Sequence, residues 1–245
     1  MKAKLGFNKS AVSYGFISNT NTHTRLTGDA WGWNVGAMWT PVENVRIGAS
    51  YRSAVGHTVN GTLNTDNNIK VPVGGIIVAL PTSMNAQVSM DAPAWAMLSA
   101  AWDVNDWLSL YGTMRWADWS SFKALTIETK SVPFASEKNW KDTYLYSVGY
   151  DARINSFWTL RGGIAYETST IDDKYTRTGT IPDADRWWFA IGSSFHWTKD
   201  FQTDVGFAHL HGVHERSLYN SKHEEIGKFR KLDAYIIGIQ GQYRF

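Results

Sequence analysis

Two strongly patterned arms, separated by a long polar stretch, occupy residues 158–197. In the first arm every second residue from Trp158 to Tyr166 is apolar or small, and the residues between them are small or polar. In the second arm Trp187, Phe189 and Ile191 share one side in the same way. Side chains alternate between the two sides of a strand, so this period of two predicts two β-strands.

The same alternation recurs along most of the chain and predicts about nine strands. Short turns and long connections alternate strictly between them, which is typical of outer-membrane barrels and unlike the crossings of a Greek-key sandwich. We expect long connections near residues 64–83, 120–141, 169–184 and 212–231. The expected strands are residues 31–39, 45–63, 87–103, 108–116, 144–152, 158–166, 187–197, 201–211 and 232–245.

Large aromatic residues stand near the ends of these strands, around an apolar middle. Trp and Tyr at both ends of an apolar band suit a strand that crosses lipid. The predicted fold class is therefore all-β, an antiparallel transmembrane β-barrel over residues 22–245, with residues 1–21 as a loop or the remnant of an upstream element. This fold requires that Trp187, Phe189 and Ile191 face hydrocarbon rather than a second layer of protein.

Composition agrees with such strands and excludes several classes of protein. The chain has 13 Trp, 14% aromatic residues and 21 Gly. No apolar run approaches the roughly 18–20 residues that a spanning helix needs. The balance of 24 Lys and Arg against 22 Asp and Glu does not indicate a nucleic-acid partner. Without Cys, neither a disulfide nor a thiolate metal site can form.

The beginning of the chain, MKAKLGFNKSAVSYG, is basic but has no continuous apolar core and no small-residue cleavage site. A secretory signal peptide needs both features. We therefore expect no signal peptide in these residues.

Six short motifs occur in the order in which one family of membrane proteins has them. They are GDAWGWNVG from Gly28, YRS from Tyr51, WADWS from Trp116, WKDTY from Trp140, LRGGIAY from Leu160 and IPDADR from Ile181. On these motifs the chain resembles, over residues 28–245, the FadL-type outer-membrane transporters of long-chain fatty acids and other hydrophobic compounds. The chain ends in an aromatic residue, Phe245, and many bacterial outer-membrane barrels end in this way.

The resemblance implies a fourteen-stranded barrel whose lumen is plugged by an amino-terminal hatch domain. A hydrophobic ligand would pass from an outer groove to an inner pocket and leave through a gap in the wall. This chain resembles only the last nine strands, so we expect it to be a carboxyl-terminal fragment of a protein that is a monomer in outer-membrane lipid or detergent when full length. Barrel diameter follows strand number, so nine strands cannot give the same closure.

A fatty-acid site needs an apolar channel and a cation for the carboxylate. The family has a basic residue just before the WKD motif, where this chain has Ser136. Lys138 lies two residues on, which restores the same side of a strand, and it is the predicted carboxylate ligand. Phe134 and Trp140 are predicted to line the apolar part of the site, with anchoring at the membrane interface as the alternative.

Arg161 lies on the polar side of its strand and would face the lumen of a barrel. It is a further candidate ligand-binding residue. Because an unpaired charge inside a barrel is costly, the alternative is an internal salt bridge with Asp151, Glu167 or Asp204.

Catalysis and metal binding are not expected. His209 and His211 share one side of a strand and His214 is near, but no carboxylate or Cys completes the ligand set. The chain has no Gly-x-Ser-x-Gly elbow. We therefore predict neither an enzyme nor a cofactor.

The predicted function is diffusive uptake of long-chain fatty acids or related hydrophobic compounds, such as aromatic hydrocarbons, across the bacterial outer membrane. Two alternatives stay open. One is a general porin-like channel with a watery pore, and the other is a soluble β-sandwich binding module or adhesin.

Overall fold

The computed structural model describes most of the chain. The described residues are 11–13, 16–18, 22–27, 29–65, 70–73, 76–79, 82–122, 124–129, 134–137, 139–177, 183–213, 217–220 and 222–245. Within these ranges no helix has the length and apolar character to cross a membrane.

The chain contains two compact units. One combines Trp33–Ser53, Pro93–Ser121 and Asn139–Phe245, and the other combines Met1–Gly32, Ala54–Ala92 and Phe122–Lys138. The expected division between residues 1–21 and 22–245 stays a prediction. Within residues 1–21 the structure describes a short hairpin of β1 (Ala11–Ser13) and β2 (Phe16–Ser18).

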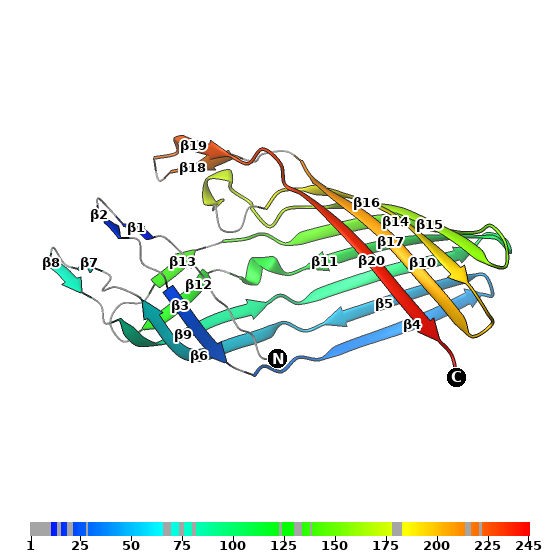
Figure 1. The fold of residues 1–245 in the computed structure, drawn as a ribbon, viewed down its shortest axis with the longest axis horizontal. Helices are drawn as coiled ribbons and strands as arrows, with labels where there is room; N and C mark the ends of the chain where they lie inside the picture. The colour runs from blue at the N-terminus through cyan, green and yellow to red at the C-terminus, as the bar shows by residue number, and fades with distance from the viewer. Residues whose placement is uncertain are drawn as a thin grey trace. The chain divides into compact units, whose positions relative to one another are not determined.

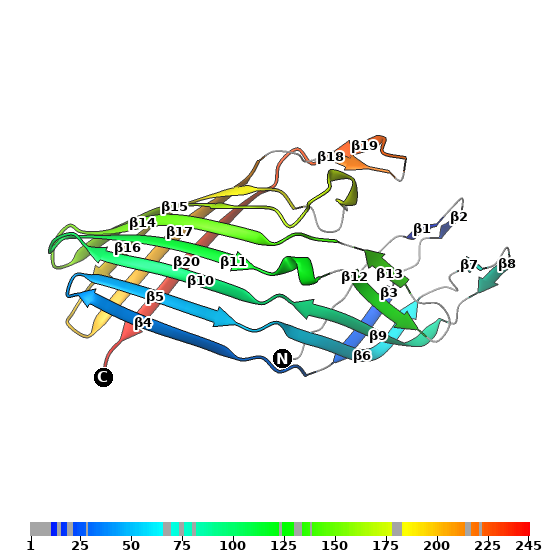
Figure 2. The same cartoon turned by 180° about the vertical axis from the view of Figure 1, so that it is seen from behind.

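A nine-stranded antiparallel sheet forms the first unit, in the order β20-β17-β16-β15-β14-β11-β10-β5-β4 (Figures 1 and 2). Every neighbouring pair is antiparallel, as the alternating pattern predicted. Its strands are β4 (Asn34–Val42), β5 (Val45–Arg52), β10 (Trp95–Asp103), β11 (Leu108–Ala117), β14 (Thr143–Arg153), β15 (Trp158–Glu167), β16 (Arg186–His196), β17 (Phe201–Gly212) and β20 (Asp233–Tyr243).

The remaining elements lie before β4 or in the connections between the nine strands. The first unit also holds the hairpin of β18 (Ser217–Tyr219) and β19 (Glu225–Lys228), and the 3₁₀ turns η1 (Trp119–Ser121) and η2 (Lys174–Thr176). The second unit holds a five-stranded sheet in the order β13-β12-β9-β6-β3 and the hairpin of β7 and β8. Its strands are β3 (Thr22–Thr27), β6 (Val55–Thr65), β7 (Lys70–Val73), β8 (Ile76–Ala79), β9 (Ser83–Ala92), β12 (Ala124–Thr129) and β13 (Phe134–Glu137).

Two expected strands were wrong in extent, because each is two strands in the structure. Residues 45–63 divide into β5 and β6, and residues 87–103 divide into β9 and β10. Pro93 follows β9 directly, and a proline has no N–H for a ladder, so the break there has a local cause.

Three expected long connections also contain strands. Residues 64–83 include β7 and β8, residues 120–141 include β12 and β13, and residues 212–231 include β18 and β19. These strands are only three to six residues long and lack a sustained alternation of apolar and polar residues, so the period that reveals a half-buried strand is missing from them.

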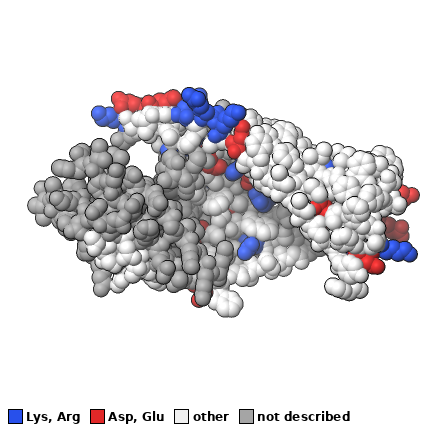
Figure 3. Space-filling model, in the orientation of Figure 1, with Lys and Arg blue, Asp and Glu red and all other residues white. Residues whose placement is uncertain are grey.

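The nine-stranded sheet has one apolar side and one polar side. On its outer side Trp187, Phe189 and Ile191 are 37%, 45% and 55% exposed, so no layer of the described protein covers them. Figure 3 shows a largely uncharged surface over β16, β17 and β20, with Lys, Arg, Asp and Glu near the strand ends. A bare apolar side is what lipid requires and what a soluble β-sandwich would bury, so the sandwich alternative is wrong.

Side chains of Asn and Thr close the short turns at one end of this sheet. Asn105 Oδ1 accepts hydrogen bonds from the N–H groups of Trp107 and Leu108, at 3.1 and 2.9 Å. Asn155 Oδ1 accepts hydrogen bonds from the N–H groups of Phe157 and Trp158 in the same way. In the third turn Thr198 Oγ1 accepts them from the N–H groups of Asp200 and Phe201. Such side chains satisfy the backbone donors of a turn locally, which explains why these connections are short.

The two-sided character of β14 can be tested at neighbouring positions. Val148, at the middle of the strand, faces outward and is 62% exposed, whereas Ser147 faces inward. In the protein expressed from its complete coding sequence and folded into lipid vesicles, Val148→Lys should lower the free energy of unfolding by about 2–4 kcal/mol, because a Lys at the bilayer midplane is costly. Ser147→Lys should cost less than about 1 kcal/mol, because the inner side is polar. Urea titration measures both, and equal losses would contradict the assignment of the two faces.

Candidate functional site

The inner side of the nine-stranded sheet is hollowed across β14, β15, β16, β17 and β20. This inner hollow has a volume of about 480 Å³. Tyr111, Asp151 and Arg161 stand at its polar border, and most of the other lining residues are glycine, alanine and isoleucine. The small inward-facing residues are Gly149, Gly163, Ala190, Gly192, Gly206, Ala208 and Gly238.

The hollow exists because small residues stand next to one another in the register of five strands. Gly149 pairs with Gly163, Gly163 with Ala190, and Gly206 with Gly192 and Gly238. A Cβ on Gly149 or Gly163 would lie 3.1 Å from a carbonyl oxygen of the neighbouring strand, so larger residues fit poorly there. A Cβ on Gly206 or Gly238 would meet nothing within 4 Å, so the space over these two glycines is open.

Arg161 lies between two carboxylates at one border of the hollow. Its Nε is 3.3 Å from Asp151 Oδ2, and its Nη1 is 3.3 Å from Asp204 Oδ1. Asp151 also accepts a hydrogen bond from the Tyr111 hydroxyl at 3.3 Å, and Asp204 accepts hydrogen bonds from Ser194 Oγ and Gln202 Nε2. The predicted internal salt bridge is therefore present with Asp151 and Asp204, but not with Glu167.

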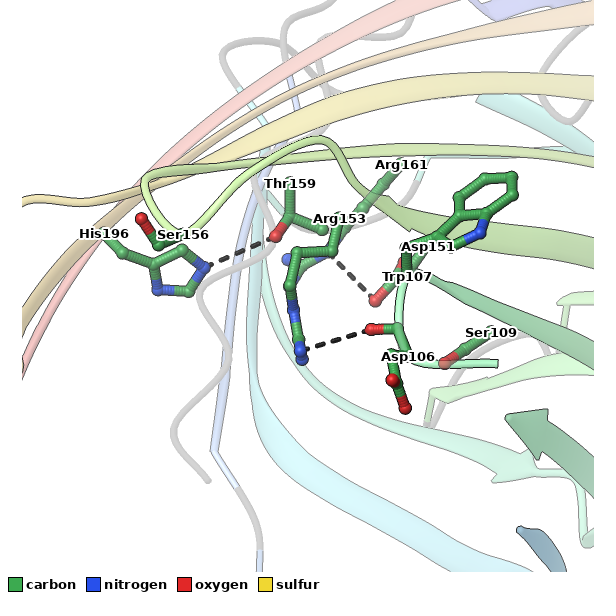
Figure 4. A pocket seen from close by; sticks show the side chains of 9 residues that line it. All are labelled: Asp106, Trp107, Ser109, Asp151, Arg153, Ser156, Thr159, Arg161 and His196. Atoms are coloured by element: carbon green, nitrogen blue, oxygen red, sulfur yellow. Dashed lines mark hydrogen bonds and ion pairs between the residues drawn. The ribbon is translucent and has the colours of Figure 1, made fainter. Parts of the chain in front are cut away.

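A polar pocket of about 470 Å³ continues from Arg161 toward the short-turn end (Figure 4). Arg153 Nη1 donates to the Asp106 carbonyl at 3.3 Å, and Thr159 Oγ1 lies 3.4 Å from His196 Nε2. Arg161 and Asp151 line both this pocket and the hollow. The inner side thus changes from polar to apolar at Arg161.

A second cluster of charges lies on the inner side near the long connections. Glu167 is 8% exposed and accepts a hydrogen bond from Arg115 Nη2 at 2.8 Å and one from Trp188 Nε1 at 3.1 Å. Arg186 lies 3.3 Å from Glu167 and 3.0 Å from Asp183. Because these charges are mutually compensated, the inner side tolerates them beside the apolar hollow.

The six motifs of the sequence meet in pairs at the bases of the connections. We call these contacts the base clamps. In the first, Ser53 N donates to Trp33 O at 2.9 Å, Trp33 N donates to Ser53 Oγ at 3.0 Å, and the rings of Trp33 and Tyr51 lie 5.4 Å apart.

The second base clamp joins WADWS to WKDTY. Asp142 accepts hydrogen bonds from Trp116 Nε1 at 2.8 Å and from Ser120 N at 3.0 Å. The rings of Trp119 and Trp140 meet edge to face at 5.2 Å. Burial raises the pKa of Asp142, but the hydrogen bonds from Trp116 and Ser120 outweigh it and hold that pKa below its usual value.

The third base clamp joins LRGGIAY to IPDADR across the connection between β15 and β16. Asp185 accepts hydrogen bonds from the Tyr166 hydroxyl and from Ser169 N, both at 2.7 Å. Asp183 accepts hydrogen bonds from Ser169 Oγ at 3.0 Å and from Thr170 N at 2.8 Å. The motifs that identify the chain therefore fasten its connections, and one of them, LRGGIAY, also contributes Arg161, Gly162 and Gly163 to the lining of the inner hollow.

A family model described as "Outer membrane protein transport protein (OMPP1/FadL/TodX)" matches residues 2–245. The chain belongs to this family. Curated relatives of the FadL/TodX chain include the 47 kDa outer membrane protein of Pasteurella multocida, 27% identical over 91% of this chain, and the long-chain fatty acid transport protein of Escherichia coli K12, 28% identical over 83%. The chain spans 52% and 47% of their lengths, so about half of each.

Solved structures confirm the fold of this FadL/TodX chain. A FadL homologue of Pseudomonas aeruginosa superposes with a TM-score of 0.70 at 22% identity, over 94% of this chain and 55% of that one. The toluene transporter TbuX of Ralstonia pickettii superposes with a TM-score of 0.62 at 16% identity, over 91% and 50%. The nine-stranded sheet is therefore part of a FadL/TodX-type barrel, as the sequence predicted.

Membership in the FadL/TodX family also establishes the location of the chain and its broad class. Its relatives are outer-membrane proteins, and its barrel strands place it in the bacterial outer membrane as a protein that crosses several times. The family is one of transport proteins rather than enzymes.

The predicted ligand-binding residues of this FadL/TodX chain are spread over different elements. Arg161 lies at the border of the inner hollow, whereas Trp140 packs in the second base clamp. Phe134 begins β13, and Lys138 lies outside the described residues, as does His214. The roles of Lys138, Phe134, Trp140 and Arg161 in binding stay predictions.

Sequence reasoning missed the small residues of the hollow. Their signal is the run of Gly and Ala at inward positions, for example Ala190 and Gly192 of β16. This signal acquires meaning only when the register of adjacent strands is known.

Replacing Asp142 tests the second base clamp. Asp142→Asn should lower the free energy of unfolding by about 1–2 kcal/mol at pH 7, because two donors lose a charged acceptor. The folded-state pKa is below the unfolded value of about 3.9, so the advantage of the carboxylate is complete above that pH and is lost as pH falls through the folded pKa. Urea titrations at pH 7 and pH 3 in vesicles should show the wild type and variant converging.

The matched control is Asp172→Asn, which removes an exposed carboxylate 3.6 Å from Lys141. It should change stability by less than about 0.5 kcal/mol at either pH. An equal effect of the two substitutions would show that Asp142 is an ordinary surface charge.

Proposed function

We propose that this chain forms part of the wall of an outer-membrane channel through which hydrophobic compounds enter the cell by passive diffusion. The inner hollow carries this proposal. It is an apolar surface on the inner side of a sheet whose outer side is suited to lipid. A ligand that crosses the membrane region along such a wall leaves water gradually, and no bond in it is made or broken.

Long-chain fatty acids are the proposed substrates, with aromatic hydrocarbons as the second candidate. An alkyl chain fits against the low Gly and Ala surface without displacing side chains, because the space over Gly206 and Gly238 is open. The long-chain fatty acid transport protein of E. coli and the toluene transporter TbuX, by their names, represent the two substrate classes among the similar proteins. Either class needs the hollow, but only a fatty acid also needs a cation.

Arg161 is a poor candidate for that cation. Its guanidinium already lies 3.3 Å from each of two carboxylates, so an arriving fatty acid would have to displace one of them. We propose that Lys138 binds the carboxylate, that Phe134 and Trp140 contact the adjoining part of the alkyl chain, and that Arg161 fixes the border of the hollow.

A watery porin-like pore is the less favoured alternative. In such a pore the inner side is polar throughout. Here the middle of the described inner side is formed by glycine, alanine and isoleucine, and the charges flank it. An apolar inner surface of this kind favours the passage of hydrophobic solutes over that of sugars.

Filling the hollow should block uptake. Gly206→Phe places a ring where a Cβ meets nothing within 4 Å, so the side chain projects into the hollow without a clash at its base. In cells carrying the protein from its complete coding sequence, uptake of radiolabelled oleate should fall by about tenfold, a barrier increase near 1.4 kcal/mol. Folding is checked by resistance of the barrel to heat in detergent.

Gly112→Phe is the matched control for this experiment. A Cβ on Gly112 also meets nothing within 4 Å, but Gly112 faces outward beside Ala100 and Val148. Its uptake should equal that of the wild type. If Gly206→Phe folds and transports oleate normally, the hollow is not on the path.

The carboxylate ligand is tested separately. Lys138→Ala should weaken oleate binding by about tenfold, because one charge-assisted hydrogen bond contributes roughly 1.5 kcal/mol or more. Toluene has no carboxylate, so its uptake should stay unchanged. Lys199→Ala, in the short turn between β16 and β17, is the control. Unchanged oleate binding in the Lys138 variant would remove that residue from the site and leave the hollow unaffected.

A further inference from the structure

Two histidines and an aspartate meet on the outer side of β17 and β20, where the last long connection begins and ends. His209 and His211 are alternate residues of β17, so their side chains share a side. Asp233, the first residue of β20, pairs directly with His211. The expectation that no carboxylate completes this set was wrong, because the pairing of β17 with β20 brings Asp233 to the two histidines.

The three side chains are close enough to share one ion. One possible ligand atom from each of the three lies within 4.8 Å of the others. His211 Nδ1 and Asp233 Oδ1 are 2.8 Å apart. Donor atoms around a tetrahedral zinc ion lie about 3.3 Å apart, given bonds of roughly 2.0–2.1 Å, so small side-chain rotations bring the three to that spacing.

His209 adds an observation that a simple hydrogen-bonded pair does not explain. Its Nε2 is buried and has no hydrogen-bond partner among the described residues. Its ring is stacked on Tyr235, with ring centres 4.7 Å apart and planes 11° apart, and Phe189 lies on a neighbouring strand at 6.4 Å. A buried imidazole nitrogen without a partner is costly, and coordination to a metal would satisfy it.

We propose that His209, His211 and Asp233 form a binding site for a divalent transition-metal ion, with Zn²⁺ as the best fit. Two imidazole nitrogens and one carboxylate oxygen are ligands that zinc accepts, whereas Mg²⁺ and Ca²⁺ prefer oxygen alone. Three protein ligands leave a coordination position for water. The side chain of His211 is 47% exposed and stands one residue before the end of β17, so an ion and its water can reach it at the rim of the sheet.

The position of the site indicates what a bound ion does. β17 ends at Gly212 and β20 begins at Asp233, so the ion would join both ends of the connection between them. Tyr235 and Phe189 stand beside it, and Trp187 pairs with His211 from β16. The ion would hold this hairpin closed at the rim, independently of which compound the channel admits.

The proposal is tested with Zn²⁺ alone on the protein in detergent micelles, expressed from its complete coding sequence without a histidine tag. Calorimetric titration should give one ion per chain. His209→Asn, His211→Asn and Asp233→Asn should each weaken zinc binding at least about tenfold, the loss typical of disturbed metal sites. Mg²⁺ should not compete.

His223→Asn is the matched control. His223 is an exposed histidine of the same connection, at a positive φ of 63° that Asn tolerates. This variant should bind zinc like the wild type. Equal loss in the control and in the three ligand variants would overturn the proposal, because it would mean nonspecific chelation by exposed histidines.

A spectroscopic measurement on the wild type keeps the test independent of variant folding. Cu²⁺ binds the same kinds of ligand, and its electron paramagnetic resonance spectrum shows coupling to coordinating nitrogens. Coupling to two imidazole nitrogens at one equivalent of Cu²⁺ supports the site. No retained ion, or coupling to fewer than two nitrogens, leaves only a cross-strand hydrogen bond between His211 and Asp233.

Discussion

The antiparallel ladder that joins the nine strands from β4 to β20 is the constraint on which the rest of the structure depends. Inside a bilayer no water is available to backbone N–H and C=O groups, so each strand must satisfy its neighbours. The ladder also assigns every residue to one of two environments, because side chains alternate. On β16, Ile191 meets the outside while its neighbours Ala190 and Gly192 line the inner hollow. A shift of one residue would exchange the two environments along the whole strand.

The inner side combines charge and apolar surface without leaving its main charges uncompensated. Arg161 lies between Asp151 and Asp204, and Glu167 lies between Arg115 and Arg186. Both clusters draw their members from different strands, so they connect strands across the sheet as well as neutralising one another. The glycines and alanines between the two clusters have no long side chains, so the inner side is hollowed there. The ion pairs on the flanks hold the strands together, and the small residues in the middle leave space for a ligand.

The sequence predicted the nine-stranded sheet because each of its strands has one apolar side. The alternation from Trp158 to Tyr166 and the partners of Arg161 could be inferred from residue type alone. The five-stranded sheet could be predicted only in part. Residues of β6 and β9 fall within expected strands, but alternation does not show that they separate from β5 and β10. The hollow and the meeting of His211 with Asp233 depend on register between strands, which residue spacing does not contain. What could be predicted was local periodicity, and what was missed was juxtaposition across strands.

The base clamps allow the connections to change in sequence and length without changing the strands of the sheet. Because Asp142, Asp185 and Ser53 fasten the chain at the point where it leaves the sheet, events farther out are mechanically insulated from the strands. Doubling the length of a flexible connection costs only about 0.6 kcal/mol of closure entropy. The connections can therefore change in length at little cost in free energy while the strands of the nine-stranded sheet keep their register.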